Sequence, residues 1–470
     1  MVAYATSAIA LDLGTTTIKA GLLNADGGLA RVTVRASPAV TVSDGRYESD
    51  ALAYAQAAEG LLVELLALSD GMPPLGICSQ RSSFLVWERA GGQALTPLIS
   101  WQDTRGDASC AALHSSDDMI HESTGLRLTP YYLAPKLRVL LLEHPEWHAR
   151  LERGELLVGT LDTFLVWRWT EGKHYVTDAS MAARTLLMDV RCQCWSRELC
   201  ELFGIPLSAL PEIRPSAGVK LPLVQETVLQ ASLADQSAAM IASIGEDRSA
   251  ALVNLGTGGF VIRHLEEGRE DQSGYLRTLV YQDRSLRAHF AIEGTLNSIA
   301  AALAPYPARE CHIADLAETE IYCLAEPTGI GAPYFSDKVG LTFSEPVDHL
   351  TPGQVASLLL EGIIFRVAQI LEDFHNMSPI EKIYLSGGLS ELVCLQQGIA
   401  QCSPCDVYRL TQRNASLHGA SLLASDNVSS LSGKAKQALV EKIAVTQNAT
   451  ALTEKYLRWK DWLVKTLGTP

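Results

Sequence analysis

Residues 8–23 read AIALDLGTTTIKAGLL, two apolar runs joined by a short turn of glycine and threonine. The pattern predicts strands at 8–13 and 18–23, and residues 24–28 have the Asp and Gly residues of a second turn. We therefore expect a β-hairpin at the start of the chain. Because glycine and threonine leave backbone N–H groups and hydroxyls unobstructed, the first turn is a candidate phosphate-binding loop, formed by Gly14, Thr15, Thr16 and Thr17.

A second segment far along the chain repeats this arrangement. A strand-like run at 249–255 is followed by a turn of small residues at 256–259 and by another strand-like run at 260–264. Gly14 and Gly256 are 242 positions apart, close to half of the chain. An internal duplication of an α/β unit explains this spacing. We expect two domains, at 1–242 and 243–470.

The remaining periodicity also predicts an α/β architecture. Apolar residues have helical spacing at 51–68 and 355–372, and strand-like runs occur at 75–79, 84–87 and 382–385. Gly387 and Gly388 predict a turn that leads into a helix. Helices beyond about residue 434 are expected to pack on the outside.

Length and charge exclude several classes of protein. A chain of 470 residues is too long for one ordinary core, and 47% hydrophobic with 19% charged residues is typical of a globular protein. The formal charge of −15 repels nucleic acid and anionic lipid, so neither is expected as a partner. A homodimer is compatible with this composition.

The first residues of the chain do not have the features of a secretory signal. No basic segment precedes the first apolar run, and Asp12 interrupts that run. No uninterrupted apolar run reaches the roughly 18 residues needed to span a bilayer. We therefore expect a cytoplasmic protein.

The ten cysteines include two close pairs, Cys192 with Cys194 and Cys402 with Cys405. A structural zinc site would need both pairs together, but they lie in different predicted domains. Free thiols are expected rather than a metal site or disulfides.

Charged residues flank the first turn. Asp12 precedes it, where a carboxylate could hold Mg²⁺ directly or through water, and Lys19 follows it, where an ammonium could neutralise phosphate charge. Taken singly, the turn is an ordinary hairpin turn, Asp12 a turn-capping acid and Lys19 a solvated charge. The second Gly-Thr turn favours phosphate binding. The chain has no G-x-x-x-x-G-K-[ST] loop and no G-x-G-x-x-G loop that opens a helix after a strand.

Several further motifs accompany the two turns in a fixed order. In sequence the set is Asp12-Leu13-Gly14-Thr15-Thr16-Thr17-Ile18-Lys19, Ser79-Gln80-Arg81-Ser82, Trp101-Gln102-Asp103-Thr104-Arg105, Thr124-Gly125 with Tyr131 and Lys136, Ala234-Asp235-Gln236-Ser237-Ala238-Ala239, Gly256-Thr257-Gly258, Glu293-Gly294, Gly331-Ala332-Pro333-Tyr334, Ser386-Gly387-Gly388 and His418-Gly419-Ala420. Through these motifs the sequence, from about residue 8 to 425, resembles the FGGY carbohydrate kinases of the actin-like ATPase superfamily.

The resemblance implies two RNase H-like domains with an active site in the cleft between them. ATP would lie mainly on the C-terminal domain and the sugar mainly on the N-terminal one, and closure would exclude water, which competes as phosphoryl acceptor. ATP and Mg²⁺ are the implied cofactors, with Asp12 at the metal. The implied nucleotide-binding residues are Gly14, Thr15, Thr16, Thr17, Lys19, Gly256, Thr257, Gly258, Gly387, Gly388, Ser390 and Glu391.

The resemblance also implies a catalytic base and a substrate site. Asp235 matches the family's catalytic aspartate, and a carboxylate can accept the hydroxyl proton late in phosphoryl transfer. Taken alone, Asp235 would be a helix N-cap. The substrate-binding set is most similar to that of the glycerol kinases within this family and comprises Arg81, Ser82, Trp101, Tyr131, Asp235, Gln236 and Phe260. Arg and Gln supply hydroxyl contacts and aromatic rings pack on the carbon face of a polyol, although single aromatic residues more often belong to a core.

Two positions depart from the family pattern. Ser82 stands where the glycerol kinases have a carboxylate, and the lost charge-assisted hydrogen bonds would be worth roughly 2–3 kcal/mol. A longer polyol or a ketose is therefore as good a hypothesis as glycerol. After Gly388 the chain continues Leu389-Ser390-Glu391-Leu392 where the family often has a polar Asn, so adenine contacts are expected from Ser390, from Glu391, or from backbone and stacking.

The expected activity is ATP-dependent phosphorylation of a hydroxyl of a small polyol or sugar. Two alternatives stay open. One is an actin-fold ATPase that acts on a protein partner, and Arg81, Trp101 and Gln236 argue against it. The other is a catalytically silent homologue that senses a sugar, and the presence of Asp12, Lys19 and Asp235 argues against it.

Overall fold

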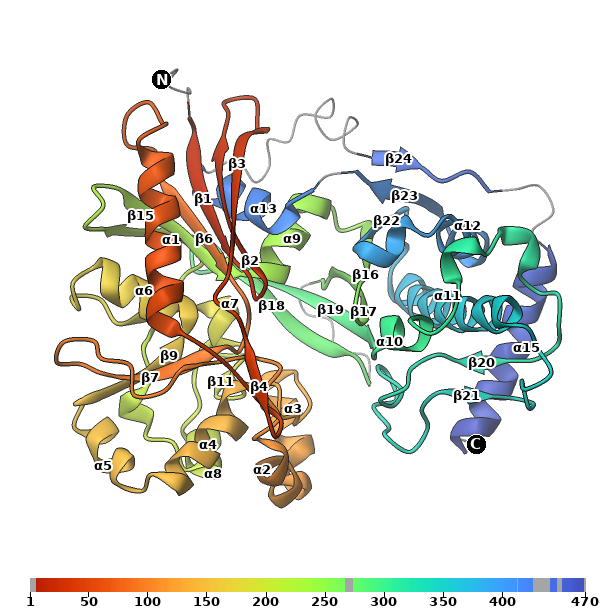
Figure 1. Ribbon diagram of the computed structural model, residues 1–470, viewed down its shortest axis with the longest axis horizontal. Helices are drawn as coiled ribbons and strands as arrows, with labels where there is room; N and C mark the ends of the chain where they lie inside the picture. Colours follow the sequence, from red (N-terminus) through yellow and green to blue (C-terminus); the bar gives the residue numbers. More distant parts are fainter. Residues whose placement is uncertain (1–5, 267–273, 412, 426–439, 446–449, 469–470) are drawn as a thin grey trace. The chain divides into compact units, whose positions relative to one another are not determined.

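The computed structural model describes residues 6–266, 274–411, 413–425, 440–445 and 450–468 (Figure 1). The chain forms two compact units. Unit 1 comprises Met1–Gly245, Arg277–Phe290 and Asn414–Ala435, and unit 2 comprises Glu246–Leu276, Ala291–Arg413 and Lys436–Pro470. The division expected at 242–243 assigned both short segments of unit 1 to the second domain, whereas they pack with the first.

A mixed sheet forms the centre of unit 1. In spatial order its strands are β14 (Ala217–Pro222), β15 (Val228–Ala234), β6 (Leu75–Ser79), β1 (Ala8–Leu13), β2 (Thr17–Leu23) and β3 (Leu29–Ala36). Strand β1 pairs antiparallel with β2 and parallel with β6, which confirms the predicted hairpin. All six residues of β1 are buried, because helices α1 (Ala51–Leu66) and α13 (Ala415–Ala424) cover opposite sides of these strands (Figure 1).

Helix α13 approaches helix α9 (Asp235–Ile244) through a glycine. A Cβ atom at Gly419 would lie 1.8 Å from the carbonyl oxygen of Ala238, and one at Gly76 would lie 2.3 Å from the carbonyl oxygen of Ala420. Only hydrogen side chains allow these backbones to come so close. This close packing explains why a segment from the end of the chain belongs to unit 1.

Replacing Gly419 with alanine is therefore expected to destabilise unit 1 by about 2–3 kcal/mol, because the added methyl group would force α13 away from α9. Thermal or urea unfolding measures the change. Gly353→Ala is a matched control, since its Cβ would meet nothing closer than 4.0 Å at the start of another helix. Alanine normally stabilises a helix relative to glycine. A Gly419→Ala variant as stable as the control variant would contradict the packing argument.

A second layer of unit 1 contains a smaller sheet with helices around it. Its strands run in the order β4 (Thr41–Ser43), β5 (Arg46–Ser49), β8 (Leu98–Ile99), β7 (Phe84–Glu88) and β9 (Leu156–Thr160). The surrounding elements are α2 (Asp107–Ala112), α3 (Asp117–Thr124), α4 (Leu133–Glu143), α5 (Glu146–Glu152), α6 (Leu161–Trp169), β10 (Val176–Asp178), α7 (Ala179–Ala182), β11 (Met188–Asp189), β12 (Cys194–Trp195), α8 (Arg197–Phe203) and β13 (Glu212–Arg214).

The expectation of free thiols was wrong for one pair of cysteines. Cys192 and Cys194 form a disulfide in the turn between β11 and β12, where their Cα atoms are 5.3 Å apart. A turn that folds two nearby cysteines back on each other is not visible from their spacing alone. Cys402 and Cys405 are free thiols, as expected.

Unit 2 repeats the hairpin and parallel-strand arrangement of unit 1. Strand β16 (Ala250–Leu255) pairs antiparallel with β17 (Gly259–His264) and parallel with β22 (Lys382–Ser386), as β1 does with β2 and β6. The other paired strands of this sheet include β19 (Ala288–Leu296), β23 (Asp406–Leu410) and β24 (Val440–Lys442). The repeat of β-hairpin and parallel neighbour supports an internal duplication.

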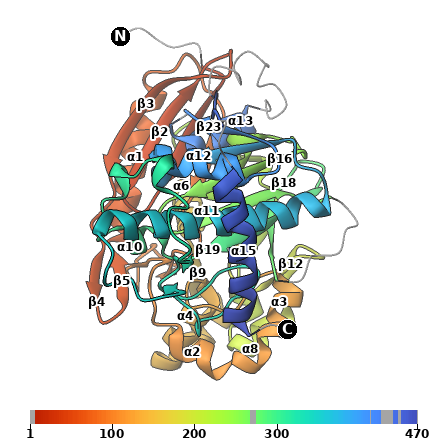
Figure 2. The same ribbon diagram turned by 90° about the vertical axis from the view of Figure 1, so that its right-hand side faces the viewer.

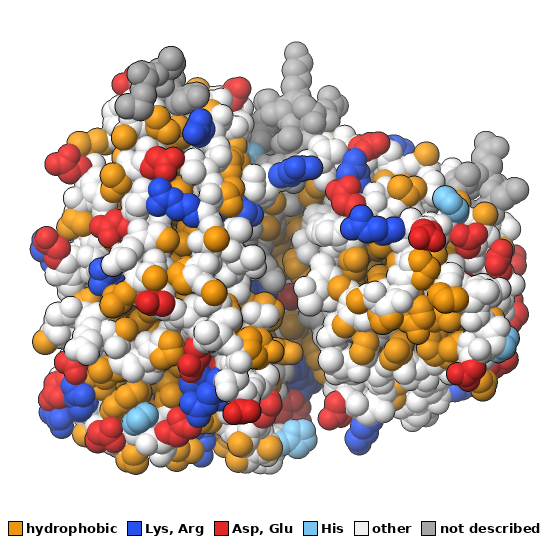
Figure 3. All heavy atoms as spheres, viewed as in Figure 1, with side chains coloured by type: hydrophobic (Ala, Val, Ile, Leu, Met, Phe, Trp, Pro, Cys, Tyr) orange, Lys and Arg blue, Asp and Glu red, His pale blue; other side chains and the backbone are white. Residues whose placement is uncertain are grey.

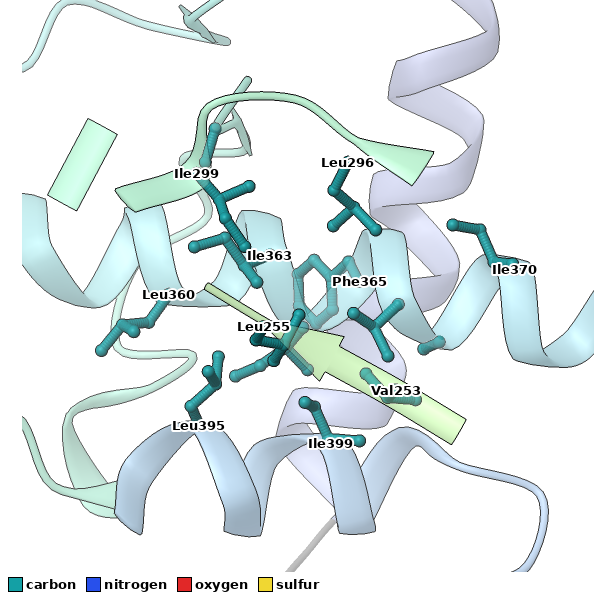
Figure 4. Close-up of a cluster of buried hydrophobic side chains, with 14 of the residues drawn as sticks. Val253, Leu255, Leu296, Ile299, Leu360, Ile363, Phe365, Ile370, Leu395 and Ile399 are labelled. Atoms are coloured by element: carbon teal, nitrogen blue, oxygen red, sulfur yellow. The ribbon is translucent and has the colours of Figure 1, made fainter. Parts of the chain in front are cut away.

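The core of unit 2 surrounds helix α11 (Pro352–Met377). In Figure 4, Val253 and Leu255 of β16 face Ile363 and Phe365 of α11, with Leu395 and Ile399 of α12 (Val393–Cys402) below them. Helix α15 (Thr450–Leu467) crosses α11 (Figure 2). The C-terminal helix was expected to pack on the outside, and α15 does so: one of its faces is exposed, while Trp459 on the other face is fully buried against this core.

Helix α11 has the length and apolarity of a membrane span, with a mean hydropathy of 1.5 over its most apolar window. However, 89% of that window is buried inside the protein, as in the core helix of a globular unit. The helix also carries Glu361 and Arg366, both buried and both ion-paired.

On the face drawn in Figure 3, Lys and Arg side chains are scattered among acidic ones rather than gathered in one patch.

Candidate active site

The first Gly-Thr turn lies beside a pair of opposite charges. The register of β1 and β2 places Asp12 opposite Lys19, and Lys19 Nζ lies 3.6 Å from Asp12 Oδ2. Burial raises the pKa of Asp12 to about 6, Lys19 opposes that shift, and the negative charge of Asp235 adds to it. Two carboxylates and one ammonium are therefore within electrostatic reach of one another in unit 1.

Two side-chain hydrogen bonds hold the backbone of this turn in place. The carbonyl oxygen of Gly14 accepts hydrogen bonds from the Tyr54 hydroxyl at 2.8 Å and the Ser37 hydroxyl at 2.9 Å. Thr16 at the tip is exposed, while Thr15 and Thr17 are half-buried. The turn thus keeps a fixed backbone and presents an exposed hydroxyl, as a phosphate-binding loop requires.

Asp235 is the first residue inside α9, after the N-cap Ala234. Its Oδ1 accepts a hydrogen bond from the backbone N–H of Gln236 at 2.7 Å. The side chain is half-buried, and desolvation raises the pKa of its carboxyl while the Arg81 guanidinium opposes the rise. A carboxylate that is partly accessible and less acidic than usual is suited to accept a proton.

The predicted acceptor-binding residues of unit 1 come together around the turn. Arg81 donates a hydrogen bond to the Oε1 of Gln236. Trp101 Nε1 donates to Thr15 Oγ1 at 3.1 Å, and Thr15 Oγ1 donates to Gln80 Oε1 at 2.9 Å. These bonds join the first Gly-Thr turn to the segments that carry Arg81 and Trp101.

Trp101 and Tyr131 are surface residues rather than core residues. Their side chains are 38% and 49% exposed, and their ring centroids lie 6.2 Å apart. Two exposed aromatic rings close together, one of them bonded to the Thr15 hydroxyl, form a surface that suits a polyhydroxy compound. The alternative that these aromatics fill a core does not fit their exposure.

Ser82 and Arg184 meet in this region. Ser82 has a positive φ of 62°, is 4% exposed, and donates its hydroxyl to the carbonyl oxygen of Arg184 at 2.8 Å. The guanidinium of Arg184 is buried and lies 5.5 Å from the ring centre of Tyr132. Like Arg81, it opposes the rise that desolvation causes in the pKa of Asp235. Sequence reasoning missed Arg184, because no motif around it distinguishes it from other arginines.

The predicted nucleotide-binding residues of unit 2 lie on two turns. In the first, the N–H of Gly256 donates to the carbonyl oxygen of Gly258 at 2.8 Å, and Thr257 is exposed at the tip. In the second, Gly387 has a φ of 90° and a Cβ there would lie 2.3 Å from the carbonyl oxygen of Leu255, so only glycine fits. A Cβ at Gly388 would meet nothing within 4 Å.

Ser390 and Glu391 differ in their exposure. The Ser390 hydroxyl is buried and donates to the carbonyl oxygen of Gly387 at 2.7 Å, so it closes the turn. Glu391 is exposed and pairs with Arg409 at 3.1 Å. Phe260, predicted to contact the acceptor, lies half-buried on β17 of unit 2, whereas the other predicted acceptor residues lie in unit 1.

A magnesium ion would find one protein carboxylate next to the first turn. Among the described residues there is no group of three or more His, Cys, Asp and Glu side chains that could hold a metal alone. Mg²⁺ is commonly bound by one or two carboxylates together with phosphate oxygens and water. The single carboxylate of Asp12 is therefore suited to a Mg²⁺ ion that arrives with phosphate oxygens and water, and not to a metal ion bound by protein side chains alone.

Comparison with known proteins shows which family of enzymes has this sequence and fold. Residues 7–254 match the N-terminal domain of the FGGY family of carbohydrate kinases, and residues 251–426 match its C-terminal domain. The chain is 28% identical to a glycerol kinase of Shewanella baltica, covering 97% of this chain and 98% of that one. It is 29% identical to an apulose kinase of Pectobacterium atrosepticum, covering 97% of both. The crystal structure of Plasmodium falciparum glycerol kinase with ADP has a TM-score of 0.85 at 21% identity, with 98% of each chain covered.

Two RNase H-like units, each with a Gly-Thr hairpin beside a parallel strand, define a two-domain α/β protein of the actin-like ATPase fold. The matches extend over nearly the whole described chain. The chain belongs to the FGGY family of carbohydrate kinases, and it is a carbohydrate kinase. Kinases of this family use ATP and act on small sugars or polyols.

Proposed function

We propose that the protein transfers the γ-phosphoryl group of ATP to a hydroxyl of a small polyol or ketose, with Asp235 as the catalytic base. The observation that carries the proposal is the half-buried Asp235 carboxylate, which has a raised pKa and lies within electrostatic range of Arg81. Its partial exposure lets a hydroxyl approach, and its raised pKa makes it a better proton acceptor.

In the proposed reaction, the acceptor hydroxyl gives its proton to a carboxylate oxygen of Asp235. The hydroxyl oxygen forms a bond to the γ-phosphorus while the bond from that phosphorus to the β–γ bridging oxygen breaks, and ADP leaves. Lys19 and the amides and hydroxyls of the first turn stabilise charge on the phosphoryl oxygens. Mg²⁺ held through Asp12 would neutralise phosphate charge.

For the nucleotide, we propose binding to the two turns of unit 2, with Gly256, Thr257 and Gly258 at phosphates. The open space around Gly388 supports an approach of a flat base or ribose to the backbone there. Glu391, rather than the buried Ser390 hydroxyl, is the side chain available for a polar contact. Because the reaction consumes ATP, we infer that the protein acts in the cytoplasm.

For the acceptor, Arg81 and Gln236 would bind hydroxyls, and Trp101 and Tyr131 would pack on carbon. The Ser82 hydroxyl already donates its hydrogen bond to the Arg184 carbonyl oxygen. Ser82 would therefore not supply the charge-assisted hydrogen bonds to the acceptor that a carboxylate at this position would supply. The similar proteins named above include a glycerol kinase and an apulose kinase. We therefore propose a polyol or a ketose as the acceptor.

An ADP-release screen over glycerol, tetritols, pentitols and common ketoses, repeated with ATP, GTP and CTP, tests the proposal. Acceptor-dependent ADP release from one of these compounds is the expected result. Thermal stabilisation by a sugar without ADP release would instead identify a sensor. ATP hydrolysis that no acceptor stimulates would favour an ATPase that acts on a protein partner.

Trp101→Ala is expected to raise the KM for the acceptor by about tenfold, because it removes both the exposed ring and the hydrogen bond to Thr15. The KM for ATP should change little. Steady-state kinetics with each substrate varied in turn measures both values. Trp101→Phe, which keeps a ring but loses the N–H donor, serves as the control and should fall between the wild type and Trp101→Ala. If the wild type, Trp101→Ala and Trp101→Phe had equal KM values for the acceptor, Trp101 would not be part of the acceptor site.

A further inference from the structure

A lysine without exposed surface lies beneath the candidate acceptor site. Lys136 belongs to α4 and is 0% exposed. Its Nζ donates hydrogen bonds to the carbonyl oxygens of Ser100 at 2.8 Å, Tyr131 at 3.1 Å and Ser82 at 3.4 Å. A lysine ammonium has three N–H donors, so one carbonyl from each of three separate segments uses all of them.

These three segments are the ones that carry the candidate acceptor-binding side chains. Ser82 directly follows Arg81, Ser100 directly precedes Trp101, and Tyr131 is itself a candidate. The Ser100 carbonyl belongs to the same peptide unit as the Trp101 N–H, which donates to Ser83 Oγ at 3.0 Å. The Lys136 ammonium therefore joins the three backbone segments that position the Arg81 guanidinium and the rings of Trp101 and Tyr131.

Lys136 Nζ is bound by backbone oxygens rather than by a carboxylate. Each of its hydrogen-bond partners is a neutral carbonyl. Burial lowers the pKa of the ammonium to about 7, with Asp103 opposing that shift and Arg105 adding to it. The Asp103 carboxylate is itself bound to Arg105 at 2.7 Å and to the N–H of Tyr47 at 2.8 Å. Burying a charge without a paired carboxylate is costly, and here the three carbonyl contacts offset part of that cost.

We propose that Lys136 is a positioning residue of the acceptor site, which holds the Arg81, Trp101 and Tyr131 segments at the separations needed to contact one acceptor molecule. The proposal rests on the proposed function, because it requires those three residues to bind the acceptor. It assigns Lys136 no contact with the nucleotide and no part in proton transfer. Its loss should therefore affect one substrate and spare the other.

Lys136→Met is the test, because methionine fills nearly the same volume without a charge or donors. We expect kcat/KM for the acceptor to fall by about 10- to 100-fold, since small displacements of binding groups have effects of that size. The KM for ATP should stay within about twofold, and the melting temperature should fall only moderately, because three carbonyl oxygens lose a donor. Leu137→Met, a volume-conserving change at the next buried position of α4, is the matched control and should leave all three values unchanged.

The possible outcomes separate the two proposals. An unchanged acceptor KM and kcat in Lys136→Met, with an active wild type, would overturn the role of Lys136 and leave the proposed function intact. Equal losses for both substrates with a lower melting temperature would show a structural role and also overturn it. If Lys136→Met does not fold, Lys136→Gln, which keeps two donors, should show the same selective loss to a smaller degree. Absence of acceptor-dependent ADP release from the wild type would overturn the proposed function itself.

Discussion

Asp235→Asn is expected to lower kcat by about 10²- to 10⁴-fold, the range that removal of a general base produces. Asparagine has nearly the same shape as aspartate, and its side-chain oxygen can still accept the hydrogen bond from the Gln236 N–H. It cannot take up the proton of the acceptor hydroxyl at neutral pH. Turnover should collapse while the fold and the helix start are kept. Initial rates of ADP release with saturating substrates measure the loss.

Binding measurements complete this test. The affinity for ATP should be nearly unaffected, because the residues proposed to bind the nucleotide base lie on the turns of unit 2. Asp118→Asn is a suitable control, since the Asp118 side chain is 98% exposed on α3 and should leave kcat unchanged. If Asp235→Asn kept a kcat within about threefold of the wild type, far less than removal of a general base costs, Asp235 would not be the base.

Arg366→Met is expected to destabilise unit 2 by about 3–5 kcal/mol, the cost of leaving a buried carboxylate without its partner. Arg366 and Glu326 are 0% and 1% exposed, and Arg366 Nε lies 2.8 Å from Glu326 Oε1. The other oxygen of Glu326 accepts the N–H groups of Asn297 and Gly331 at 2.8 Å each. Without the guanidinium, Glu326 must remain charged and unpaired or take up a proton. Urea unfolding measures the loss.

An exposed pair in the same unit provides the comparison. Arg409 and Glu391 are joined at 3.1 Å, but the Glu391 side chain is 68% exposed, so Arg409→Met should cost less than about 1 kcal/mol. The double variant Arg366→Met, Glu326→Gln removes the unpaired charge and should recover part of the stability. Equal stability losses in Arg366→Met and Arg409→Met would show that burial does not govern the strength of these pairs.

Short-range patterns in the sequence were sufficient to predict the strands and helices around the two Gly-Thr turns. The predicted strand at 75–79 is β6, and the predicted helix at 51–68 is α1, which ends two residues earlier than expected. These predictions depended on hydrophobic periodicity and on turn residues within the same segment. The second hairpin was found in the same way, because it repeats the first.

Contacts between distant segments were not predictable in this way. No periodicity in 415–424 indicates that this helix packs on α9 through Gly419 rather than with unit 2. The Cys192–Cys194 disulfide depends on how a local turn bends. The buried Arg184 and the three carbonyls around Lys136 come from segments separated by up to 102 residues. The spacing of residues along the chain does not indicate which distant side chains and carbonyl groups come into contact in the folded protein.

By itself, the sequence determined that this chain has two α/β units with Gly-Thr hairpins and belongs to a family of carbohydrate kinases, because strands, turns and motifs are encoded locally. Tertiary structure alone decided which polar groups meet: the half-buried state of Asp235, the bond between Trp101 and Thr15, and the ammonium of Lys136 beneath three loops. The physical reason is that pKa shifts and hydrogen bonds depend on distance and desolvation in space. Order along the chain specifies neither of them.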